Sequence, residues 1–102
     1  MMGKDKLQEL IERIKEFSDK TFPESTVQSK LLHLKKEIVE LINEPDSIEE
    51  WADVIILFLN AWAHNKHSSN FLYAIIEAKM DINDKRKWGK PDENGIVEHI
   101  KE

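Results

Sequence analysis

The chain has 102 residues, which suits one domain. Its formal net charge is -5, and it contains no cluster of Lys and Arg of the kind that binds a nucleic acid polymer. It contains no cysteine, which excludes disulfides, Cys-based zinc sites and a thiol nucleophile, and fits a reducing cytoplasm. The longest apolar run, 54–59, is too short to cross a membrane. We therefore expect a cytoplasmic protein. A domain this small buries only about 60–65% of its unfolded surface, so we also expect a homodimer or homotetramer.

The first two predicted elements are helices, because apolar residues recur at three- and four-residue steps. The first helix spans about residues 4–20, and Phe22-Pro23 ends it, since the residue before a proline is disfavoured in the helical region. The second helix begins between residues 24 and 26 and runs to about residue 43, where Glu44-Pro45-Asp46 stops it.

The third predicted helix follows Ser47-Ile48-Glu49-Glu50, which has the form of a capping box, and runs to about residue 65. It is apolar almost all round, so we expect it to be the central and most buried element. A fourth helix extends over about 68–87, and the tail 88–102 carries an Asn94-Gly95 turn. These elements predict an all-α fold, a single domain over 1–102 with four helices in an antiparallel bundle and an irregular C-terminal tail.

In six pairs of acidic residues the two members lie three positions apart, so spacing alone singles out none of these pairs. The pairs can be distinguished by the helical face that each one occupies. Glu37 and Glu40 flank the apolar stripe of the second helix, and Glu50 and Asp53 lie on a helix with almost no polar side. Carboxylates at the edge of a core repel one another and lose hydration, so they need protons, cationic partners or a metal. Two such pairs on antiparallel helices could enclose Mg²⁺, which prefers oxygen ligands.

Simpler structural interpretations exist for most of these acids. Glu50 could be the reciprocal arm of the predicted capping box. Glu37 and Glu40 could form ion pairs with the lysines at positions 35 and 36 or with a neighbouring helix. Asp53 has no comparable structural explanation, because it lies one turn inside the helix expected to be most buried.

Lys79, Asn83 and Arg86 fall within a stripe of about 60° on the fourth helix. This stripe continues an apolar line and therefore faces inward. Basic groups opposite an acidic metal site suit a polyphosphate, whose oxygens divide between the metal and the cations. Alternatively, Lys79 and Arg86 could neutralise the carboxylates directly. His33 lies one turn before Glu37 and could contact it.

The two acidic pairs, followed by Lys79, Asn83, Arg86 and Trp88, resemble the MazG-like all-α nucleoside triphosphate pyrophosphohydrolases. The segments 33–37, 49–54 and 87–95, together with Thr21-Phe22, look closer still to the small dATP/dGTP diphosphohydrolase branch. Asn60 is a departure, because many relatives are expected to carry an acid there.

The resemblance implies a bacterial or phage-encoded enzyme that uses Mg²⁺, or Mn²⁺, to hydrolyse a purine deoxynucleoside triphosphate to the monophosphate and pyrophosphate. Another nucleotide, such as dUTP or a damaged triphosphate, is an alternative substrate, and a non-enzymatic helical interaction protein is an alternative function. The metal would be bound by Glu37, Glu40, Glu50 and Asp53. Of these, Glu37 and Glu40 are the catalytic candidates. Phosphates would be held by Lys79, Asn83 and Arg86. The candidates for contacts to the base, or to the side chains that bind the metal, are Phe17, Thr21, Phe22, His33, Asn60 and Trp88.

Overall fold

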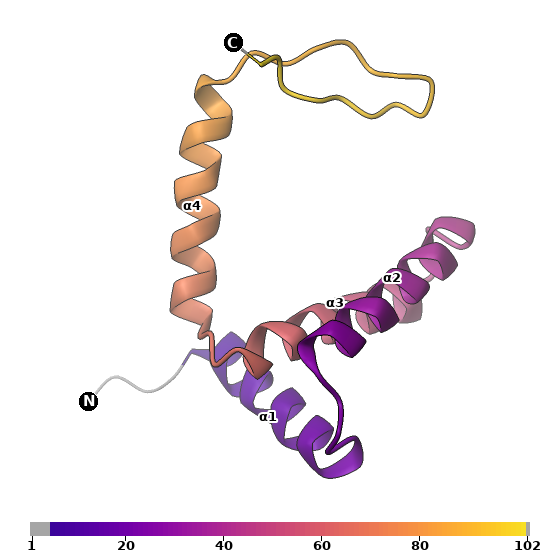
Figure 1. Ribbon diagram of the computed structural model, residues 1–102, viewed down its shortest axis with the longest axis vertical. Helices are drawn as coiled ribbons and strands as arrows, with labels where there is room; N and C mark the ends of the chain where they lie inside the picture. Colours follow the sequence, from indigo (N-terminus) through magenta and orange to yellow (C-terminus); the bar gives the residue numbers. More distant parts are fainter. Residues whose placement is uncertain (1–4, 102) are drawn as a thin grey trace. The chain divides into compact units, whose positions relative to one another are not determined.

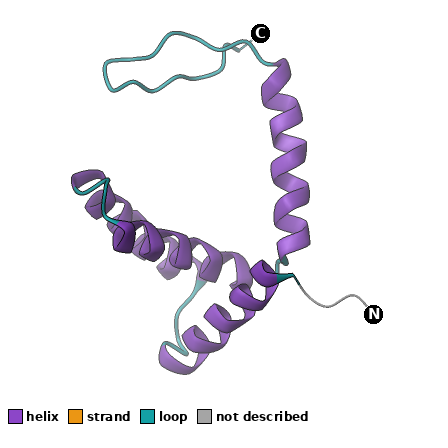
Figure 2. Ribbon diagram, turned by 180° about the vertical axis from the view of Figure 1, so that it is seen from behind, coloured by secondary structure: helices purple, strands orange, loops and turns teal. Residues whose placement is uncertain are grey.

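The computed structural model describes residues 5–101, which form four α-helices joined by loops (Figures 1 and 2). The helices are α1 (Lys6–Thr21), α2 (Val27–Asn43), α3 (Ile48–His64) and α4 (Ser69–Lys85). These bounds lie within about two residues of the predicted ones, except that residue 4 is outside the described part of the chain. The prediction of an all-α fold is confirmed. The chain divides into two compact units, Met1–Ser69 and Asn70–Glu102, and each is described by itself.

Side-chain caps fix where the helices of the first unit begin. Asp5 accepts a hydrogen bond from the Gln8 backbone N–H at 2.6 Å, and Thr26 and Ser29 cap α2 reciprocally. These side chains satisfy backbone N–H groups that have no partner within the helix, which is why polar residues mark each start. Asp5 also accepts a hydrogen bond from the buried Ser69 hydroxyl at 2.9 Å, so the end of the unit is attached to its first helix.

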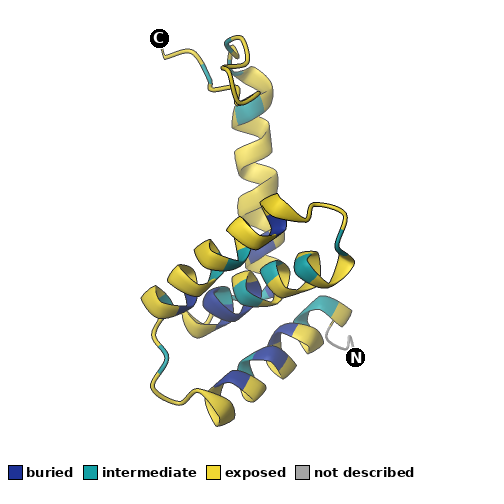
Figure 3. Ribbon diagram, turned by 90° about the vertical axis from the view of Figure 1, so that its right-hand side faces the viewer, coloured by how far each residue is buried: buried dark blue, intermediate teal, exposed yellow. Residues whose placement is uncertain are grey.

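Helix α3 is the centre of the first unit, as predicted, because both α1 and α2 contact it. The buried apolar side chains of this unit come from all three helices (Figure 3). They are Ile11, Ile14, Leu41, Leu59, Ala61 and Ala63. The apolar surface of α3 is nevertheless only partly covered, since Trp51, Ile55 and Ile56 are 47%, 51% and 45% exposed.

The second unit contains α4 and a tail that is better ordered than the predicted irregular segment. Trp88 and His99 form an antiparallel bridge, and their rings meet edge to face. The predicted turn is confirmed: Asp92 accepts hydrogen bonds from the backbone N–H groups of Asn94 and Ile96, and Gly95 has a φ of 80°, which suits glycine.

The cap of α2 generates a stability prediction. Thr26 Oγ1 accepts from the Ser29 N–H at 3.0 Å, and Ser29 Oγ accepts from the Thr26 N–H at 2.9 Å. Replacing Thr26 by Ala should lower the free energy of unfolding by about 1 kcal/mol, measured by urea denaturation. Gln28→Ala, on the exposed side of the same turn, is the matched control. Equal destabilisation by the two variants would contradict the role of the cap.

Candidate active site

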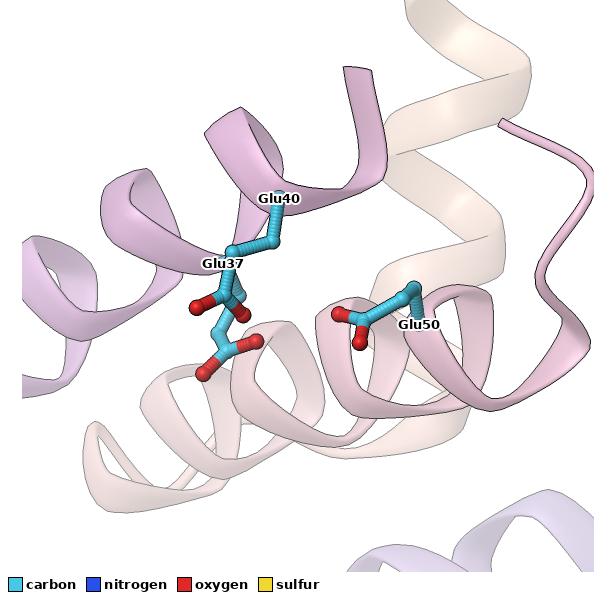
Figure 4. Close-up of side chains that lie close together, drawn as sticks. All are labelled: Glu37, Glu40 and Glu50. Carbon is cyan, nitrogen blue, oxygen red and sulfur yellow. The ribbon is translucent and has the colours of Figure 1, made fainter. Parts of the chain in front are cut away.

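Three carboxylates meet across the α2–α3 hairpin. Glu37 and Glu40 extend from α2, and Glu50 extends from the first turn of α3. The residues 44–47 between the helices reverse the chain, so the end of α2 lies beside the start of α3 (Figure 1). One ligand oxygen from each of the three residues lies within 4.8 Å of the others, and the side chains turn toward a common space (Figure 4). We call Glu37, Glu40 and Glu50 the acidic trio.

The side chain of Glu50 does not take part in capping the start of α3. Its backbone N–H donates to Ser47 Oγ at 3.3 Å, whereas the Ser47 N–H donates to the Glu44 carbonyl at 3.0 Å. The Ser47 N–H therefore needs no help from the Glu50 carboxylate, and the capping explanation of this side chain is wrong. Within the described part of the chain, the buried oxygen Oε2 of Glu50 has no hydrogen-bond partner. A buried carboxylate oxygen without a partner is costly, which indicates that a ligand is to be bound here.

The electrostatics of the acidic trio favour a cation. Burial raises the pKa of Glu50, and the negative charges of Glu40 and Asp53 raise it further. The pKa of Glu40 is raised by its hydrogen bond with the Glu37 carboxyl and by the charge of that group. His33 Nε2, 3.4 Å from Glu37 Oε1, is the ion-pair partner that the described residues offer Glu37. Three carboxylates so close together, with one orphaned oxygen, fit a hard divalent cation.

Asp53, the fourth predicted metal ligand, lies outside the acidic trio. It is exposed and stands one turn after Glu50 on α3. Its charge nevertheless acts on Glu50, so the two side chains belong to the same electrostatic environment.

The predicted phosphate-binding residues belong to the second unit. Asn83 and Arg86 are half-buried and in contact, with Arg86 Nη1 donating to Asn83 Oδ1 at 3.5 Å, and Lys79 is exposed. The Trp88 indole N–H donates to the Asn83 carbonyl at 3.2 Å. The structure thus brings Asn83, Arg86 and Trp88 together.

Most candidates for contacts to the base gather in the first unit. Thr21, the last residue of α1, is exposed and precedes Phe22. Four of the candidates line one cavity between the helices, namely Phe17, Phe22, His33 and Asn60. The same cavity is lined by Ser18 and Lys30, both buried, which the sequence analysis missed. The signal for Lys30 was its spacing from Val27 and Leu34, which places it on the inward side of α2.

The fold and the acidic trio together define a MazG-like protein. The chain superposes on a MazG-like pyrophosphohydrolase of cyanophage S-2L with a TM-score of 0.79 and 29% sequence identity, covering 94% of this chain and 93% of that one. That relative is described as bound to dGDP and three catalytic Mn²⁺ ions per active site.

The sequence comparisons are more specific. The family model of the dATP/dGTP pyrophosphohydrolases matches residues 10–102, and the chain belongs to this family. A "dATP/dGTP diphosphohydrolase" of Salmonella phage PMBT28 is 33% identical over 85 residues, which are 82% of this chain but 28% of that protein. The chain therefore spans less than a third of this relative. No helix within residues 5–101 is long and apolar enough to cross a membrane.

The raised pKa values of Glu40 and Glu50 predict how the metal-free protein responds to pH. A carboxyl with a raised pKa in the folded state binds its proton more tightly there than in the unfolded chain. Its contribution to stability is therefore complete below the ordinary pKa of 4.5 and is lost as the pH rises through the raised value. In EDTA, Glu50→Gln should remove part of this loss, so thermal unfolding of the variant should depend less on pH between about 4.5 and 7.

A divalent cation should reverse the effect at neutral pH. Mg²⁺ or Mn²⁺ at about 100 times its Kd should stabilise the protein by about 2.7 kcal/mol. The same addition should stabilise Glu50→Gln much less. Glu49→Gln, an exposed neighbour with the same change of charge, is the control and should respond like the unmodified protein. Equal metal responses of the two variants would show that Glu50 is not a ligand.

Proposed function

We propose that the chain hydrolyses dATP or dGTP to the monophosphate and pyrophosphate with Mg²⁺, or with Mn²⁺ in its place. The observation that carries the proposal is the acidic trio with its orphaned buried Glu50 oxygen. Membership of the dATP/dGTP pyrophosphohydrolase family supports the substrate class. The dGDP and Mn²⁺ bound by the cyanophage relative support a nucleotide and a divalent cation at the same site.

The reaction joins a water oxygen to the α-phosphorus and breaks the bond from that phosphorus to the bridging oxygen, so pyrophosphate leaves. The divalent cation supplies positive charge that stabilises the charge developing on the phosphoryl oxygens and makes a nearby water more acidic. Glu37, Glu40 and Glu50 would hold the cation, and Asp53, one turn after Glu50, would be a further ligand. Glu37 accepts the proton of the attacking water. His33, exposed and 3.4 Å from Glu37, orients this carboxylate and passes the proton to solvent.

The second unit provides the positive charges that a triphosphate needs beyond the metal. Arg86 and Lys79 bind phosphate oxygens, because guanidinium and ammonium groups form charge-assisted hydrogen bonds with them. The contact between Arg86 and Asn83 holds the guanidinium in place before the substrate arrives. Trp88 supports Asn83 through its indole N–H.

The active form is a homodimer or homotetramer. Large apolar side chains remain exposed on α2 and α3, among them Leu32 at 64%, Ile42 at 69% and Ile55 at 51%. An apolar groove of about 520 Å³ also runs between α1 and α3. Surfaces of this kind mark protein–protein interfaces.

The oligomer is tested by light scattering coupled to gel filtration. We expect a mass two or four times the 12.0 kDa of the chain. Ile55→Lys places a charge in the apolar groove and should shift the population toward the monomer. Glu24→Lys, in the exposed connection before α2, should leave the mass unchanged. A monomeric unmodified protein would overturn the oligomer.

The reaction is tested by incubating the protein with each deoxynucleoside triphosphate and Mg²⁺ and measuring pyrophosphate and monophosphate. Release from dATP or dGTP is expected, while release only from dUTP or a damaged nucleotide would reassign the substrate. Glu50→Gln and Asp53→Asn should lower the rate by about 10²–10³-fold, the scale for losing one electrostatic stabiliser of a transition state. Absence of pyrophosphate from every nucleotide would rule out the enzyme.

A further inference from the structure

A cavity of about 300 Å³ lies between α1, α2 and α3 in the first unit. Its walls are mostly apolar, with Ile14 and Leu57 among them, and two phenylalanines stand at its side. The rings of Phe17 and Phe22 meet edge to face at 6.2 Å and are 60% and 56% exposed, so neither is covered by the helices. A flat aromatic ligand would cover such rings.

Three polar side chains are buried in the wall of this cavity. Ser18, Lys30 and Asn60 are 2%, 4% and 8% exposed. Asn60 Nδ2 donates to Ser18 Oγ at 3.0 Å, but Asn60 Oδ1 has no partner among the described residues. Lys30 Nζ donates to Ser25 Oγ at 2.8 Å, and the charges of Lys30 and the exposed Asp19 attract each other. Within residues 5–101, no carboxylate lies at ion-pair distance from Lys30.

The hydrogen-bonding capacity of Lys30 and Asn60 is only partly used, and the unused donors and acceptor indicate which groups a ligand must offer. A buried ammonium carries three N–H donors and a charge, and one hydroxyl cannot compensate for lost hydration. An orphaned amide oxygen likewise needs a donor. The cavity is therefore suited to a flat molecule that offers acceptors to Lys30 and an N–H group to Asn60.

Guanine has this pattern. Its O6 and N7 are adjacent acceptors that lysine and arginine recognise, whereas adenine presents an amino donor in place of O6. The N1–H and the 2-amino group of guanine follow O6 along the ring and are donors for Asn60 Oδ1. Adenine would leave the ammonium facing a donor and would satisfy fewer of these groups.

The distance to the acidic trio suits a nucleotide. Lys30 lies seven residues before Glu37 on α2, and Asn60 lies seven residues after Asp53 on α3. Seven helical residues span about 10 Å, a length that a nucleotide covers from the far edge of its base, across the deoxyribose, to the α-phosphate. His33 connects the two places, because it lines the cavity and lies 3.4 Å from Glu37.

We infer that this cavity is the base subsite and that Lys30 and Asn60 select guanine over adenine. The inference rests on the proposed function for the position of the phosphates, whereas the recognition of the base depends on the cavity alone.

Hydrolysis of dGTP and dATP by Lys30→Met tests the selection. The unmodified protein should have a higher kcat/KM for dGTP, and the variant should reduce the dGTP/dATP ratio by about tenfold to a hundredfold, the usual discrimination of a bidentate base contact. Lys35→Met, an exposed lysine of the same helix, should keep the ratio. An unchanged ratio in Lys30→Met, or a preference of the unmodified protein for dATP, would overturn the inference and leave the hydrolase intact.

A second measurement needs neither turnover nor a folded variant. The Asn60 side-chain amide of the unmodified protein is followed by NMR in EDTA while dGMP or dAMP is added. We expect dGMP to shift this signal and to bind at least about tenfold more tightly than dAMP. Selective binding without hydrolysis of any triphosphate would keep the base subsite and remove the proposed reaction. Equal shifts and equal affinities for the two nucleotides would overturn the selection of guanine, and no shift with either nucleotide would overturn the base subsite.

Discussion

The packing of α2 against α3 is the contact on which the rest of this site depends. The inward side of α2 follows a three- and four-residue rhythm, and apolar residues alternate on it with charged ones. Val27, Leu34 and Leu41 provide the apolar contacts, while Lys30 and Glu37 occupy the positions between them. A strictly apolar stripe would stabilise the pair more, since charges lose hydration when they are buried. The hairpin is thus less stable than a fully apolar one, but its rigid helices hold polar groups in fixed positions.

Opposite charges are kept at opposite ends of this hairpin. The acidic trio lies at the 44–47 turn, where α2 ends and α3 begins, and Lys30 lies two turns away beside Asn60. If the lysine stood among the carboxylates, it would neutralise them and their ion pair would need no further ligand. Separation leaves a negative site for a cation and a positive site for an acceptor, with His33 between them. A nucleotide, with phosphates at one end and a base at the other, has the complementary arrangement.

Local patterns in the sequence were sufficient for the helices and for part of the site. The apolar period and the capping residues located all four helices, because both depend on residues close in sequence. The helical face on which Glu37, Glu40 and Glu50 lie also follows from residues close in sequence, so these acids could be singled out. Which of the acids is central to the site was not predictable: Asp53 had no simple structural explanation and Glu50 had one as a capping residue, yet Glu50 carries the orphaned oxygen. That outcome depended on which backbone group satisfied the Ser47 N–H, a choice made by the turn geometry.

The base-side polar groups could not be predicted because they depend on contacts far apart in sequence. Ser18 is 42 positions from Asn60, and the hydrogen bond that orients the amide exists only once α1 has packed on α3. The presence of Lys30 in the same cavity explains why position 60 carries Asn, where an acid is expected in many relatives. A carboxylate there would share the cavity with Lys30 and would be attracted to the buried ammonium. The uncharged amide of Asn60 adds no negative charge inside the cavity beside Lys30, so the ammonium group remains available to a ligand.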